Sequence, residues 1–386
     1  MIESRRPFEP PQGYQMVSTL SQRSVTSVYR CIRQEDQCPV VLKALHSEYP
    51  SPGLLARFRR EFQLTHMLHA QELVKAYALI RHENSLVMVL EDFGGESLQT
   101  FLTQESPTLS ERLEVMLSMA QALEVLHQKE VIHKDINPSN FVWNSETKQG
   151  KLIDFGISTQ LSREHSQFHS PSELEGTLTY ISPEQTGRMN RALDHRTDLY
   201  SLGVSFYEIL TGQLPFQSDD DLELLHAHIA KRPQPPHLLQ DNIPIILSEI
   251  ICKLMAKDAE QRYQSAYGLE FDLQRCKQLL DEHDEIASFP LGQEDFPQTL
   301  HFPQKLYGRE EQVATLMEAF ARTTKGATEL LLITGSAGIG KTALVQEIYK
   351  PITEKRGFFL AGKFDQLQRN TPYYPIVQAF QELFTQ

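Results

Sequence analysis

The sequence predicts an α+β protein in which a small β-rich lobe is followed by a helical lobe, and then by the beginning of an α/β unit. Three observations predict this. Short β-rich runs separated by polar turns fill residues 14–49, long stretches after residue 109 repeat at helical spacing, and an apolar run at 330–334 enters a glycine-rich loop. A chain of 386 residues also exceeds what one hydrophobic core usually organises, which favours two domains.

The first lobe is expected to be a small antiparallel sheet with one helix. Residues 27–32 and 39–43 read as strands, and 86–90 reads as a buried strand. In the helix between them, Glu61 shares one face with apolar residues, so its carboxylate needs a partner. The residues on that face are Leu54, Phe58, Glu61, Thr65 and Leu68.

The helical lobe begins with a helix at 109–127, where Thr108 and Glu111 have the spacing of a capping box. Two short strands are expected at 141–143 and 151–153. Further helices are expected at 198–211, 221–231, 243–256 and 265–280.

Acidic residues and prolines then predict a linker, and beyond it come a helix at 309–322 and the α/β unit. The expected division is a tail at 1–13, a first domain at 14–281, a linker at 282–305 and a second domain at 306–386.

Composition narrows the functional classes. The net charge of -13 argues against nucleic acid and anionic lipid as partners. Four cysteines without close pairing predict neither a zinc site nor a disulfide scaffold, and favour a reducing cytoplasm. The sequence shows neither a signal-peptide pattern nor an apolar stretch of about 20 residues, so we expect a soluble, cytoplasmic protein.

The segment 133–140 has the spacing of a protein-kinase catalytic loop, with Asp135 and Asn140 at its two polar positions. Asp154-Phe155-Gly156 follows after a short strand, and Lys43 ends the strand at 39–43. Any one of these is a weak signal, but each predicts the position of the next.

Together with Gly176-Thr177 through Pro183-Glu184, these motifs resemble the bacterial Hanks-type serine/threonine kinases over about 14–280. The resemblance implies a bilobed protein-kinase fold that uses ATP and Mg²⁺. Asp135 would accept the substrate hydroxyl proton, Lys43 would contact the phosphates with Glu61 as its ion-pair partner, and Asn140 and Asp154 would bind the metal. Leu20, Val28 and the backbone of Glu91 and Phe93 would hold the nucleotide. The helix starting at Asp198 would brace the catalytic loop, and Arg262 would pair with Glu184.

Three departures from the family concern the chemistry. Ser21, Arg23 and Thr26 occupy the glycine places of the phosphate-covering loop, so either Arg23 supplies charge there or the loop has no nucleotide role. Lys134 replaces an arginine that grips an activation-loop phosphate, which implies weaker control by phosphorylation. Asn137 replaces a lysine on the transferred phosphate, a loss worth roughly 100-fold to 1000-fold in rate.

The activation segment is rich in hydroxyl side chains. Thr177 is expected to order the catalytic loop. The candidate autophosphorylation sites are Ser158, Thr159, Ser162, Ser166, Ser170 and Ser172.

Residues 335–342 fit the phosphate-binding loop Gly-x-x-x-x-Gly-Lys-Thr, between an apolar strand and a helix at 343–349. Backbone amides from Gly335 to Gly340 would surround phosphates, with Lys341 on the outer phosphates and Thr342 on magnesium. The segment resembles the start of the AAA-like or STAND ATPase module of multidomain bacterial signalling kinases. Because no Walker B strand follows Thr342, we expect this P-loop NTPase domain to be incomplete.

The predicted function is a serine/threonine protein kinase that transfers the ATP γ-phosphate to protein hydroxyls, with signalling proteins as further partners. One alternative is a nucleotide-binding pseudokinase that acts as a scaffold. Another is an ATP-driven switch that uses residues 335–342.

Overall fold

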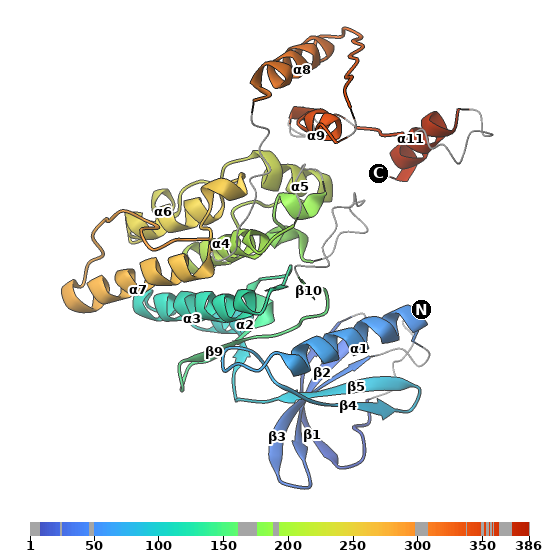
Figure 1. Cartoon of the computed structure of the whole chain (residues 1–386). Coiled ribbons are helices and arrows are strands. Elements are labelled where there is room, and N and C mark those ends of the chain that lie inside the picture. The colour runs from blue at the N-terminus through green and yellow to red at the C-terminus, as the bar shows by residue number, and fades with distance from the viewer. Residues whose placement is uncertain are drawn as a thin grey trace.

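The computed structural model describes residues 8–23, 25–45, 50–160, 176–187, 193–297, 308–336, 338–348, 351–352, 355, 357, 359–362 and 373–385. Within these residues, a β-rich lobe leads into a helical lobe, as Figure 1 shows. The predicted bilobed α+β fold is confirmed.

The first lobe is built on a five-stranded antiparallel sheet in the order β1-β2-β3-β5-β4. Its strands are β1 (Tyr14–Gln22), β2 (Thr26–Arg33), β3 (Cys38–Leu45), β4 (Ala76–His82) and β5 (Ser85–Glu91). The sequence did not predict β4, which contains three alanine or arginine residues and only one β-branched residue. It forms a strand because β5 pairs with it along its length, and such pairing outweighs weak intrinsic propensity.

Helix α1 (Pro52–Met67) packs against β4 and β5. It begins at Ser51, whose hydroxyl accepts the Leu54 amide at 3.2 Å. Side chains alternate along β3, so Leu42 faces one apolar cluster of the sheet while Lys43 and Leu45 face the other side, where Phe58 of α1 packs. The strand pattern therefore directs Lys43 toward α1.

The second lobe surrounds α3 (Leu109–Gln128), which packs beside α7 (Ala266–His283). The capping box of Thr108 and Glu111 is present. The other helices of this lobe are α2 (Leu98–Gln104), α4 (Arg196–Thr211), α5 (Asp221–Ala230) and α6 (Ile245–Leu254). The predicted helices are confirmed, with ends that differ by a few residues.

Within the described residues, five short strands form two small sheets in the second lobe. β6 (Glu96–Ser97), β8 (Phe141–Asn144) and β9 (Gln149–Leu152) form a three-stranded sheet, and β7 (Val131–Ile132) pairs with β10 (Thr159–Gln160). The catalytic-loop candidate lies between β7 and β8, and Asp154 follows β9. Both segments are thus anchored by strands at each end.

Residues 284–297, which we call the strap, pack onto the helical lobe. Ile286 and Phe289 are buried in the main hydrophobic core. The Asp295 carboxylate accepts the backbone amides of Gln264 and Ser265 at 2.8–2.9 Å, at the start of α7. We expected the linker to begin at residue 282. Its first part instead belongs to the helical lobe, because acidic and apolar side chains of the strap have buried partners there.

Three further helices are described beyond residue 307. They are α8 (Glu310–Thr323), α9 (Lys341–Gln346) and α11 (Tyr374–Thr385). The strand expected at 330–334 is not formed, and Leu330 and Leu332 are 96% and 85% exposed. A strand needs a neighbour for its backbone groups, and the described part of the chain places none there. Within the described residues, no helix has the length and apolar character needed to span a membrane.

Candidate active site

Lys43 contacts one carboxylate of its own lobe and one of the helical lobe. Its Nζ donates to Glu61 Oε1 at 2.7 Å and to Asp154 Oδ1 at 2.9 Å. Lys43 and Glu61 are only 8% and 7% exposed. Three residues that the sequence placed on a strand, a helix and a loop are thus brought into direct contact.

Burial and charge act against each other in this triad. Burial alone would lower the pKa of Lys43, but the attraction and hydrogen bonds of Glu61 and Asp154 outweigh it and raise that pKa above its ordinary value. Burial would raise the pKa of Asp154, yet Lys43 holds it below the usual range. For Glu61, burial exceeds the effect of Lys43, so its pKa is raised. Lys43 and Asp154 therefore stay charged at neutral pH.

Asp135 is held by three neutral donors. Oδ2 accepts Asn140 Nδ2 at 2.8 Å, and Oδ1 accepts the Thr177 backbone amide at 2.9 Å and Asn137 Nδ2 at 3.1 Å. Thr177 thus contacts the catalytic loop directly. Amide donors fix the direction of a carboxylate without adding a formal charge beside it.

Helix α4 holds the loop that carries Asp135 through hydrogen bonds to its backbone. The Asp198 carboxylate accepts the backbone amides of His133 and Lys134, each at 2.8 Å. Lys134 takes a positive φ of 70°, and these two bonds hold the chain in that unusual conformation. The helix that the sequence predicted as a brace makes this contact.

The backbone also links the metal-binding candidates. The amide of Ile153, the residue before Asp154, donates to the Asn140 carbonyl at 2.9 Å. Asp154 has a positive φ of 65°, and Phe155 is buried with its ring 5.2 Å from that of His133. Asp154 is therefore turned toward Lys43 while the next residue anchors it in the core.

The segment expected to bind adenine has part of its backbone already engaged. The Glu91 amide donates to the Lys75 carbonyl at 2.9 Å, and the Phe93 carbonyl accepts Asn144 Nδ2 at 2.9 Å. The Glu91 amide is therefore not available as a donor to adenine, so any hydrogen bond from Glu91 to the base would have to use its carbonyl. Asp92 between them is bonded by Arg30 Nε at 2.6 Å, a support that the sequence did not reveal.

The β1–β2 turn lies close to the same site. Leu20 on β1 is exposed, and Val28 on β2 is half-buried and pairs with Lys43 of β3. Arg23 Nη1 lies 3.8 Å from Asp154 Oδ2. The sequence had left open whether Arg23 supplies charge, and the structure brings it to the metal-binding candidate.

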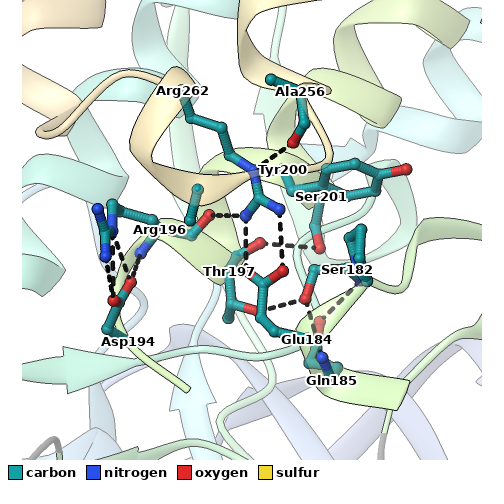
Figure 2. Close-up of polar contacts among 12 residues, drawn as sticks. Ser182, Glu184, Gln185, Asp194, Arg196, Thr197, Tyr200, Ser201, Ala256 and Arg262 are labelled. Atoms are coloured by element: carbon teal, nitrogen blue, oxygen red, sulfur yellow. Dashed lines mark hydrogen bonds and ion pairs between the residues drawn. The ribbon is translucent and has the colours of Figure 1, made fainter. Parts of the chain in front are cut away.

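A buried polar network, drawn in Figure 2, anchors the end of the activation segment. Arg262 donates to both oxygens of Glu184, at 2.5 and 2.9 Å, and the pair is almost inaccessible to solvent. The Ser182 hydroxyl bonds that of Thr197 on α4. Gln185 Nε2 donates to the Lys134 carbonyl at 2.7 Å, which connects this network to the catalytic loop. The pairing of Arg262 and Glu184 was expected, whereas the roles of Ser182 and Gln185 were not.

Only two of the candidate phosphorylation sites lie in the described residues. Ser158 is buried and donates to the His133 carbonyl at 3.1 Å, and Thr159 is in β10. Ser162, Ser166, Ser170 and Ser172 lie outside the described residues. Ser158 is thus a structural hydroxyl in this conformation.

The second nucleotide motif is exposed. Gly335, Gly338 and Gly340 have positive φ angles, and Lys341 Nζ donates to the carbonyls of Gly335 and Ser336 at 2.9 and 2.8 Å. Thr342 is exposed in α9. This helix begins at Lys341, two residues before the start predicted from the sequence. A phosphate site here stays a prediction.

Comparison with known proteins covers both parts of the chain. Residues 14–273 match the protein kinase domain model, and residues 305–386 match an AAA ATPase domain model. Serine/threonine-protein kinase PknB of Mycobacterium tuberculosis is 32% identical over 282 residues, which cover 69% of this chain and 45% of that protein. A probable serine/threonine-protein kinase of Streptomyces coelicolor is 31% identical over 269 residues, covering 68% of this chain and 40% of that protein.

Hybrid signal transduction histidine kinase G of Dictyostelium discoideum is 31% identical over 360 residues, covering 70% of this chain and 10% of that protein. The chain thus spans between a tenth and just under half of the length of these relatives. Since the kinase model covers about two thirds of the sequence and the fold has both lobes in order, the chain belongs to the protein kinase domain family.

Proposed function

We propose that the protein is a serine/threonine protein kinase that transfers the γ-phosphate of ATP to hydroxyl groups of proteins. The observation that carries this proposal is the contact of one buried lysine, Lys43, with both Glu61 and Asp154. A scaffold needs no such triad, whereas phosphoryl transfer depends on positioned charge around the phosphates. The PknB relative, a serine/threonine-protein kinase by name, supports the choice of acceptor.

In this proposal Asp135 is the catalytic base. Asn140 and Thr177 hold its carboxylate toward the acceptor hydroxyl. The hydroxyl oxygen attacks the γ-phosphorus, the bond to ADP breaks, and the hydroxyl proton passes to Asp135. Lys43 neutralises phosphate charge, and Glu61 keeps its ammonium in place.

The donors present also fit magnesium. Mg²⁺ prefers oxygen ligands, and the Asp154 carboxylate and the Asn140 amide oxygen are of that type. Within the described residues, the side-chain amide of Asn140 donates through Nδ2 to the Asp135 carbonyl and carboxylate, so Oδ1 is the oxygen that would face a metal. Bound there, Mg²⁺ would neutralise charge on the β- and γ-phosphates.

The test is transfer of radiolabelled γ-phosphate by the full chain to a serine- and threonine-containing acceptor protein. We expect Asp135→Asn to abolish transfer and Lys341→Ala to leave it within about twofold, because the chemistry belongs to the kinase lobe. Transfer that is unchanged in Asp135→Asn would refute the proposal. Transfer lost only in Lys341→Ala would assign it to the second motif.

A pseudokinase is the second candidate, and Asn137 favours it. Its amide contacts Asp135 where the family has a lysine, so the site has one positive charge fewer for the transferred phosphate. In that case the full chain binds ATP but yields no labelled acceptor under any condition that saturates the site.

A further inference from the structure

The side chain of Arg23, in the β1–β2 turn, reaches across to the other lobe. The last pair of the two strands is Gln22 with Ser27, so Arg23 is the first residue of the turn. Its side chain is 57% exposed, and Nη1 lies 3.8 Å from Asp154 Oδ2. The other oxygen of the same carboxylate, Oδ1, accepts Lys43. Two cations, Arg23 from the β1–β2 turn and Lys43 from β3, therefore contact the two oxygens of one carboxylate.

The backbone of this turn is not arranged to receive phosphate at Arg23. A glycine-rich turn directs free amides at an anion. Here the Arg23 amide donates to the Thr26 carbonyl at 2.9 Å, within the turn itself. The side chain is thus the group of Arg23 that remains for an anion.

The charges around Asp154 also favour such a role. Lys43 is buried and already has two carboxylate partners, Glu61 and Asp154, while Arg23 has a solvated head and a longer contact. A weak, exposed ion pair is easily exchanged for a stronger one. Guanidinium groups bind phosphate oxygens in a bidentate manner, which lysine does not.

We propose that Arg23 is a phosphate-binding residue, whose guanidinium moves from Asp154 onto the terminal phosphates of ATP and takes the place of the missing glycine amides. This rests on the nucleotide site of the proposed function. The side chain then selects for the charge of the nucleotide, while the adenine end is recognised elsewhere.

The test compares the binding of ATP and of adenosine, by calorimetry, to the full chain carrying Lys341→Ala, so that the second motif does not contribute. In that background we expect Arg23→Ala to weaken ATP binding on the order of 10-fold to 100-fold and to leave adenosine binding unchanged. Arg23→Lys should fall between, because it keeps the charge and loses the fork. Arg33→Ala is the matched control. Arg33 also belongs to the β-rich lobe, and it forms a solvent-accessible ion pair with an aspartate, Asp36.

The results distinguish a failure of the role proposed for Arg23 from a failure of the proposed kinase function. Equal ATP affinity in Arg23→Ala and the control overturns the role of Arg23 alone. A loss of adenosine binding together with ATP binding also overturns it, since the residue would then support the whole site. If the parent binds neither ligand, the proposed function fails together with this inference.

Discussion

At the residue scale, Lys257 is the most unusual charge in the described structure. Its Nζ donates to Tyr200 Oη at 3.1 Å and lies over the ring of Phe216, at 4.7 Å. Burial, with a smaller contribution from the neighbouring charge of Arg262, lowers the pKa of Lys257 from 10.5 to about 7. This ammonium therefore loses its proton in the folded protein at a pH where it would keep it in the unfolded chain.

The sign of the resulting pH dependence follows from proton linkage. Between about pH 7 and pH 10.5 the unfolded chain binds the proton and the folded chain does not, so stability rises with pH and is lost as pH falls to the folded value. We expect the free energy of unfolding of the wild type, relative to Lys257→Met, to increase over this window. Urea unfolding at several pH values measures it, and two parallel curves would contradict it.

At the element scale, the strap holds the beginning of α7. Asp295 accepts the amides of Gln264 and Ser265, and it also accepts the Ser265 hydroxyl at 3.1 Å. The sequence could not show this, because acidic residues and prolines have the composition of a linker whether or not their side chains find buried partners. The Arg275 guanidinium lies over the Phe289 ring at 4.3 Å, and local sequence patterns do not reveal this contact either.

Asp295→Ala tests the strap. Two backbone amides would lose a partly buried acceptor, so we expect about 1–3 kcal/mol of destabilisation and faster proteolytic cleavage within 284–297. Urea unfolding and limited proteolysis of the full chain measure the two effects. Glu294→Ala removes the neighbouring exposed carboxylate and serves as the control. Identical cleavage of both variants would show that Asp295 does not anchor the strap.

At the scale of the whole molecule, the sequence predicted the architecture better than the contacts. The resemblance to the kinase family implied the ion pair of Lys43 with Glu61, and the structure contains that contact at 2.7 Å. Local patterns carry no information about Gln185 on the Lys134 carbonyl, because 51 residues separate the partners and either side chain is ordinary by itself. The strand at 330–334 was wrong for a related reason, since an apolar run becomes a strand only beside another strand.

Arg262 ties the activation segment to the body of the helical lobe, so its loss is expected to affect the unfolding of that whole lobe. Arg262→Ala leaves the Glu184 carboxylate buried without its partner, which costs about 3–5 kcal/mol. We expect a lower melting temperature for the kinase lobe in calorimetry of the full chain. Arg33→Ala, which breaks an exposed pair, should leave the transition in place. Equal shifts for the two variants would disprove the assignment.

Because of the strap, the chain leaves the helical lobe near the start of α7 and not near its end. Helix α7 is 18 residues long, about 27 Å, and the strap returns along it from His283 to the level of Ser265. The chain therefore departs beside Gln264, whose side chain accepts Arg196 Nη1 at 2.8 Å, while the Arg196 carbonyl accepts Arg262. The end of the strap is thus connected to the guanidinium that binds Glu184 by three hydrogen bonds, through Asp295, Gln264 and Arg196, and it lies far from the C-terminal end of α7.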